Sequence, residues 1–182
     1  MKIYLLFIFL AYLSCSQKVK TIHPKHDVSF EEYVSKIDKI KLPLEGRCTK
    51  DLLGQRFNFD AEIISKYGIE NSQIYGVLAE KKNYTAILYL QATDVSLPVI
   101  VTTNKKGKKI ASLNLYEISC WQDEEIEEVS WFKINENLTI ELGDSSTTFK
   151  RKGGKDIIES SRKSTVRYRT FEIDIKGNII PL

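Results

Sequence analysis

Histidine is almost absent from the sequence, and its two copies, His23 and His26, both lie near the N-terminus. No histidine is therefore available later in the chain for a serine or cysteine triad, and these two have no third metal ligand near them in sequence. The 24 acidic residues show no spacing that pairs two of them as the acid and base of a glycosidase. The sequence accordingly predicts no enzyme active site, no metal site and no cofactor.

A large net charge and a long apolar run are also missing. The 27 basic and 24 acidic residues leave a formal charge of +3, too little for a global field that would favour nucleic acid. The apolar run over residues 3–13 is shorter than the ~20 residues of a membrane-spanning helix. We expect no nucleic-acid partner and no permanent membrane-spanning helix.

The N-terminus has the layout of a secretory signal, because Lys2 precedes this apolar run and Ser14, Cys15 and Ser16 follow it. Leu13-Ser14-Cys15 resembles the end of a bacterial lipobox. The loose form of the motif, with Tyr12 in place of Leu, Val or Ile, is similar to that of outer-membrane lipoproteins of the Bacteroidota, a group with many members of uncharacterised function.

This resemblance implies that residues 1–14 are a signal peptide and that Cys15 becomes the mature N-terminus, carrying a diacylglycerol and an N-acyl chain such as palmitate. The protein would then be held at the cell envelope. Ser16 and Gln17 lack the Asp that retains some lipoproteins on the inner membrane, so the outer membrane is favoured, on its periplasmic or its surface side. The alternatives are an ordinary signal cut near Ser14 or Ser16, leaving a free periplasmic protein, and an uncleaved anchor.

After the signal, two regions are expected. Residues 15–28 are polar and basic with Pro24 and no apolar periodicity, which predicts a flexible tether. Residues 29–182 fit a single globular domain.

The domain begins with helical periodicity and continues with strand periodicity. Ser29 precedes apolar residues at helical spacing, which predicts a helix of about ten residues ending before Pro43, and a second short helix is expected over 60–66, with Gly68 as its stop. Short apolar or alternating runs between turn residues then predict strands over 74–80, 84–92, 97–103, 110–118, 129–135, 138–142, 146–152, 165–175 and 179–180. The run over 84–92 is apolar on both faces, which predicts a central strand covered on both sides.

The expected fold class is α+β: one or two short N-terminal helices packed on a predominantly antiparallel β-meander, shaped as a sandwich or half-barrel. Residues 153–164 are rich in charged and small polar residues, which predicts a mobile loop. Apolar residues change phase between Tyr168 and Phe171, and a bulge near Arg169 and Thr170 would bring both sets inward.

Cys48 and Cys120 remain if Cys15 is acylated. In an oxidising compartment they could form a disulfide that closes a long loop. Two buried free thiols are the main alternative, and a reactive or metal-binding pair is the third.

Trp121, Trp131 and Tyr168 are the candidate contact residues for a ligand or partner, with burial in the core as the alternative. We hypothesise a membrane-anchored, non-enzymatic binding or interaction module. Its contact surface would be strand edges and the loops at 119–128 and 151–164, and its partner another protein or a cell-surface component. The alternative is a carrier or binder of a small ligand, sugar or lipid in the concavity of the sheet.

Overall fold

The computed structural model describes residues 28–50, 52, 61–92, 96–117, 120–123, 125–153 and 156–182. The expected signal peptide, Cys15, both histidines and almost all of the expected tether lie outside these ranges. No helix within them is long and apolar enough to cross a membrane.

The described chain consists mainly of antiparallel strands with two short helices, which confirms the expected α+β class. The helices are α1 (Phe30–Ser35) and α2 (Ala61–Tyr67). A four-stranded sheet contains β2 (Ser72–Glu80), β3 (Thr85–Gln91), β4 (Leu97–Thr103) and β5 (Lys109–Asn114) in that order. A six-stranded sheet has the order β1 (Leu44–Arg47), β7 (Ile126–Ile134), β8 (Ile140–Lys152), β9 (Asp156–Ile173) and β10 (Ile179–Pro181), with β6 (Trp121–Gln122) also paired to β7.

Helix α1 begins where the sequence predicts, because the Ser29 hydroxyl accepts a hydrogen bond from the Glu32 backbone N–H at 3.1 Å. It has six residues rather than about ten. The chain leaves the helix to pair with β2: the Ile40 N–H donates to the Val77 carbonyl at 2.8 Å, and the Val77 N–H donates to the Asp38 carbonyl at 2.9 Å. These bonds to β2 replace the ones that a longer helix would make.

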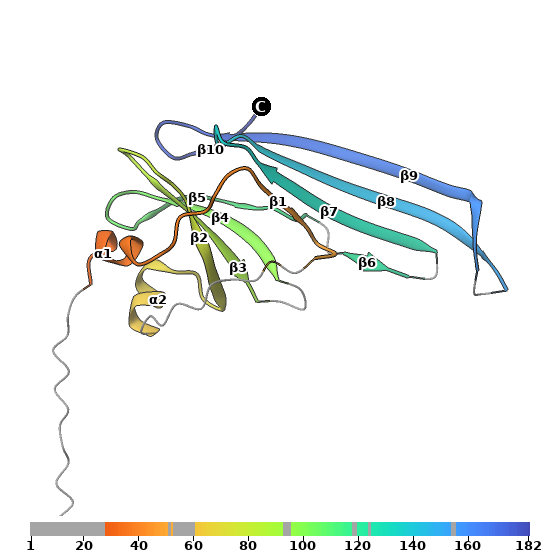
Figure 1. The fold of residues 1–182 in the computed structure, drawn as a ribbon, viewed down its shortest axis with the longest axis horizontal. Coiled ribbons are helices and arrows are strands. Elements are labelled where there is room, and N and C mark those ends of the chain that lie inside the picture. Colours follow the sequence, from red (N-terminus) through yellow and green to blue (C-terminus); the bar gives the residue numbers. More distant parts are fainter. Residues whose placement is uncertain are drawn as a thin grey trace, which may run out of the picture.

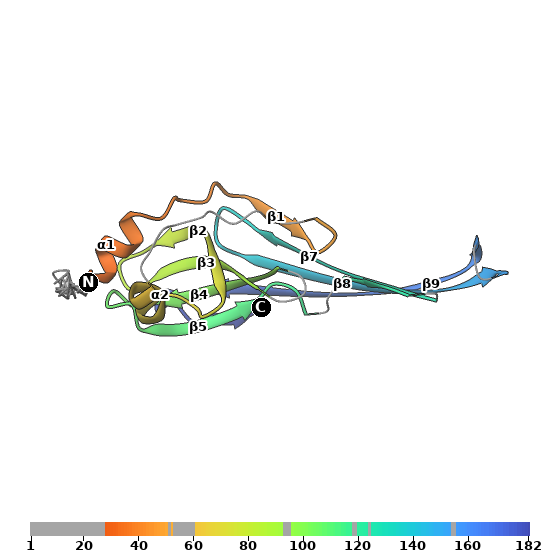
Figure 2. The same ribbon diagram turned by 90° about the horizontal axis from the view of Figure 1, so that it is seen from below.

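Three layers make up the body (Figures 1 and 2). One apolar cluster joins α1 to one face of the four-stranded sheet, with Tyr33, Ile87 and Tyr89 fully buried. A second cluster lies between the two sheets and includes Leu88, Ile100, Phe132 and Ile140. β3 faces an apolar layer on each side. For this reason nearly all of its residues are buried, and its sequence shows almost no alternation of apolar and polar residues.

Tyr116 places a hydroxyl in the inter-sheet core that has no hydrogen-bond partner among the described residues. Burial raises the pKa of Tyr116 from 10.0 to about 12. We expect Tyr116→Phe to raise the free energy of unfolding by about 1 kcal/mol, because it removes a desolvated hydroxyl and keeps the ring that packs against Phe132.

The same substitution has an alkaline signature. Above pH 10 the unfolded wild type loses the Tyr116 proton while the folded protein keeps it, so this residue makes the wild type less stable as the pH rises towards 12. Urea unfolding from pH 8 to 11 should show a smaller loss for Tyr116→Phe than for the wild type. Equal losses in the two proteins would contradict the assignment.

The six-stranded sheet extends beyond the body as a long ribbon, which we call the arm and define as residues 145–168 of β8 and β9 (Figures 1 and 2). No described residue of the arm belongs to either core cluster. The sequence-based prediction of a mobile loop over 153–164 is therefore wrong for the described residues 156–164, which belong to β9. Pairing with β8 keeps them extended, although neither face is covered by a second layer.

The predicted bulge near Arg169 and Thr170 is also wrong. The register of β8 and β9 is continuous from Ile140, opposite Phe171, to Thr148, opposite Lys163. Phe171 packs against the core, whereas Val166 and Tyr168 are 45% and 73% exposed. Val166 and Tyr168 need not face the core as Phe171 does, because β9 leaves the core between Tyr168 and Phe171.

Candidate functional site

The outer face of the six-stranded sheet, turned away from the four-stranded sheet, carries a row of aligned residues. Strand pairing places Arg47 of β1 beside Trp131 of β7, Trp131 beside Gly143 of β8, and Gly143 beside Tyr168 of β9. Residues that face each other on neighbouring strands point to the same side of a sheet. The row therefore presents a guanidinium and two aromatic rings on one surface.

Gly143 makes room for the aromatic pair. A Cβ at this position would overlap atoms of the Trp131 indole, so the indole lies over the backbone of β8, where any other residue would place a side chain. The Trp131 and Tyr168 ring centroids are 5.9 Å apart and the ring planes meet at 77°, an edge-to-face contact that aromatic pairs favour. The two rings thus support each other across a strand with no side chain between them.

Charged residues form the next row towards the end of the sheet. Lys133 Nζ lies 3.1 Å from Glu45 Oε1; the Lys133 side chain is partly exposed and the Glu45 side chain is largely exposed. Glu141 faces Lys133 from β8 and accepts a hydrogen bond from the Asn135 amide at 2.7 Å. Two carboxylates and one ammonium group therefore lie beside the aromatic pair.

The aromatic pair, Arg47 and the charged row line an open groove of about 750 Å³, within the size range of ligand sites. Its polar and charged lining is Glu45, Arg47, Thr49, Lys50, Lys133 and Glu141, and its apolar part includes Leu52, Trp131 and Tyr168. Such a surface can stack a planar or sugar ring, bury a partner's apolar side chain, and form hydrogen bonds or ion pairs at its rim.

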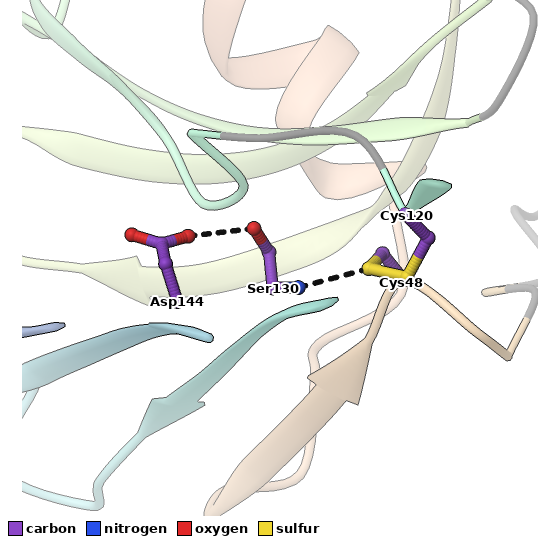
Figure 3. Close-up of a disulfide and its surroundings, with 4 residues drawn as sticks. All are labelled: Cys48, Cys120, Ser130 and Asp144. Carbon is purple, nitrogen blue, oxygen red and sulfur yellow. Dashed lines mark hydrogen bonds between the residues drawn. A yellow bond between two sulfur atoms is a disulfide. The ribbon is translucent and has the colours of Figure 1, made fainter. Parts of the chain in front are cut away.

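Cys48 and Cys120 are joined in a disulfide, with their Cα atoms 5.4 Å apart (Figure 3). Cys48 follows β1, and Cys120 precedes β6, so the bridge links two short strands that both pair with β7. Cys48 also exchanges hydrogen bonds with the backbone of Ser130, through its N–H and its Sγ, at 3.0 Å each. The bridge therefore holds β1, one wall of the groove, against β7.

Polar residues close the inter-sheet core next to this bridge. The Ser130 hydroxyl donates to Asp144 Oδ1 at 2.6 Å (Figure 3), and Arg169 Nη2 donates to Asp144 Oδ2 at 2.9 Å. Arg169 also pairs with Glu117. Because both Asp144 oxygens accept hydrogen bonds, this nearly buried carboxylate is stably accommodated where the core ends and the arm begins.

Of the three aromatic candidates, the structure brings together Trp131 and Tyr168. Trp121 is 49% exposed but lies on β6 opposite Glu128, and it does not line the groove. Sequence reasoning missed the contribution of β1, since Leu44–Arg47 shows no recognisable strand pattern. It also missed Gly143, whose role depends on the register that places Trp131 beside it.

The described residues contain no group of three or more His, Cys, Asp or Glu side chains that could hold a metal ion. No family model, no curated protein and no solved structure matches the chain.

Proposed function

We propose that the chain is an exported, lipid-anchored protein that binds a partner through the groove around Trp131 and Tyr168 and catalyses no reaction. The observation that supports the proposed binding surface most strongly is the edge-to-face aromatic pair on the outer face of a sheet, with Tyr168 73% exposed. Aromatic side chains left open to solvent in this way are typical anchors of binding surfaces.

The surroundings of the pair fit a recognition surface. The rings provide a large apolar area that loses little side-chain entropy on binding, because each already packs against the other. Arg47, Lys133, Glu45 and Glu141 provide charges of both signs at the rim, where they select partners more than they add affinity. The partner we propose is another protein or a component of the cell surface.

A second candidate is a binder of a small ligand, with a sugar as the best-fitting class. It is favoured by the volume of the groove and by carboxylates that lie beside a tryptophan and a tyrosine. Titration with soluble oligosaccharides separates the candidates: quenching of a tryptophan signal that disappears in Trp131→Ala favours the sugar, and no change favours a macromolecular partner.

Attachment is tested by mass spectrometry of the mature N-terminal peptide from the native host. We expect a peptide that begins at acylated Cys15, and a Cys15→Ser variant that is released from the membrane fraction, since several acyl chains hold a protein there almost permanently. An unmodified Cys15 within a longer N-terminal peptide would overturn the lipid anchor. That result would leave the groove to be judged by its own binding data.

A further inference from the structure

We infer that the arm has a second binding site: the free edge of β9 accepts an extended segment of a partner protein whose side chains alternate between acidic and apolar. The site is separate from the proposed function of the groove, although Tyr168 contributes to both. The first observation is that β9 has only one neighbour along most of its length. β10 covers it from Phe171 to Ile173, and before Thr170 the only described strand paired with it is β8.

The hydrogen bond between Leu182 and Thr170 shows which residues of β9 direct their backbone N–H and C=O groups away from β8. The Leu182 N–H donates to the Thr170 carbonyl at 2.9 Å, so Thr170 directs its backbone towards the side of β10, away from β8. Residues of an antiparallel strand alternate in this respect. Ser164, Val166 and Tyr168 therefore direct their N–H and C=O groups to the open edge, while Thr165 and Arg167 direct theirs to β8.

The side chains along this edge separate by chemistry. Val166 and Tyr168 lie on the outer face and are exposed. Lys163, Thr165 and Arg167 lie on the other face, and within the described chain neither Lys163 nor Arg167 forms a side-chain ion pair. A strand added here would have every second side chain beside Val166 and Tyr168, and the others beside Lys163 and Arg167.

Nearby acids do not neutralise this edge. Glu127 and Glu128 are on β7, two strands from β9, so their backbones lie roughly 10 Å from that of β9. Glu127 and Glu159 are already paired with Arg162, at 3.5 and 2.7 Å, and Asp144 is held by Ser130 and Arg169. Charge complementarity therefore selects acidic side chains on the inner face of the added strand.

A bulge limits the site at its far end. Thr148 faces Lys163 and Lys150 faces Ile158, so four residues of β9 (159–162) lie opposite Phe149 alone. The Ser161 hydroxyl accepts from the Lys150 N–H at 2.8 Å and donates to the Ile158 carbonyl at 2.6 Å. Because bulges interrupt strand addition, the regular edge runs from Lys163 to Arg169.

The test uses the mature protein with its disulfide and a labelled peptide of about seven residues that alternates Glu and Val, a length typical of strands. We expect saturable binding by fluorescence anisotropy, and at least about tenfold weaker binding of a peptide with the same residues in two blocks. Equal binding of the two peptides would mean that charge attraction alone explains the binding, and it would contradict strand addition at this edge.

Val166→Pro is the decisive variant, because it removes an N–H that points to the open edge and leaves the ladder to β8 intact. It should weaken peptide binding about tenfold or more, whereas Val166→Thr should keep it. The double variant Lys163→Glu with Arg167→Glu should abolish peptide binding. The control variant Lys152→Glu with Lys176→Glu reverses the same number of exposed charges elsewhere and should keep it. Unchanged binding in Val166→Pro, or equal loss in both charge variants, would overturn the site.

Hydrogen exchange provides an independent measure. Bound peptide should slow the exchange of the Ser164, Val166 and Tyr168 amides, and leave those of Thr165 and Arg167 little changed. Protection at other positions would contradict the inferred edge. Trp131→Ala removes the indole of the groove and the ring contact of Tyr168, but it leaves the open backbone groups of Ser164, Val166 and Tyr168 in place. This variant should therefore still bind the peptide, so that failure of the edge and failure of the groove remain distinguishable.

Discussion

Replacing Cys48 and Cys120 with alanine is expected to lower the free energy of unfolding by about 4 kcal/mol. The two residues are 72 apart in sequence, and the bridge removes the entropy that this loop would have in the unfolded chain. A loss of this size is a large fraction of the stability of a typical domain. Urea unfolding of the Cys15→Ser protein, with and without the two further substitutions, measures it.

The loss should have a local component at the groove. β1 and β6 have four and two residues, too few to hold their places on β7 by ladder hydrogen bonds alone. Without the bridge, the amides of Glu45 and Arg47 should exchange faster than those of β3. If the proteins with and without the bridge have free energies of unfolding within about 1 kcal/mol of each other, or if amide exchange at β1 does not change, the bridge does not stabilise the fold and the groove in this way.

The sequence predicts best those helices and strands that bury one or both of their faces in the core. Ser29 caps α1, the continuous runs of β3 and β4 follow from burial on both faces, and the alternation along β5 follows from burial on one face. Such patterns can be read from one sequence, because the core imposes them locally. The length of α1 could not be read in this way, since it depends on hydrogen bonds to Val77, far away in the chain.

Part of the arm escaped prediction for the opposite reason. Residues 156–164 are mostly exposed on both faces, so no apolar alternation marks them, and their extended form comes from pairing with β8. Composition alone made this segment resemble a loop. Mixed polar sequence therefore does not distinguish a loop from a strand whose two faces are both in solvent.

The groove was predicted only as separate residues. Trp131 and Tyr168 were candidates, but their contact requires a hairpin whose register places Gly143 between them. Cys48 and Cys120 were also named, with their pairing left open. Register and pairing are long-range properties, and no short motif in this chain encodes them.

Loss of binding on Trp131→Ala is the second large effect that we expect. Removing the indole also removes the edge-to-face support of Tyr168, and truncating an aromatic anchor of an interface costs about 2 kcal/mol or more, roughly 30-fold in affinity. Gly143→Ala should have a similar but smaller effect, because a methyl group there displaces the indole and does not delete it.

Site-specific photo-crosslinking in the native envelope tests most directly whether the groove is the binding surface. A photoreactive phenylalanine analogue replaces Tyr168, and in a matched control it replaces Ile175, which is 80% exposed and lies outside the groove. We predict a discrete adduct from position 168, none from position 175, and loss of the adduct when Trp131→Ala is added. The same adducts from both positions, or an adduct from position 168 that Trp131→Ala leaves unchanged, would contradict the proposed binding surface.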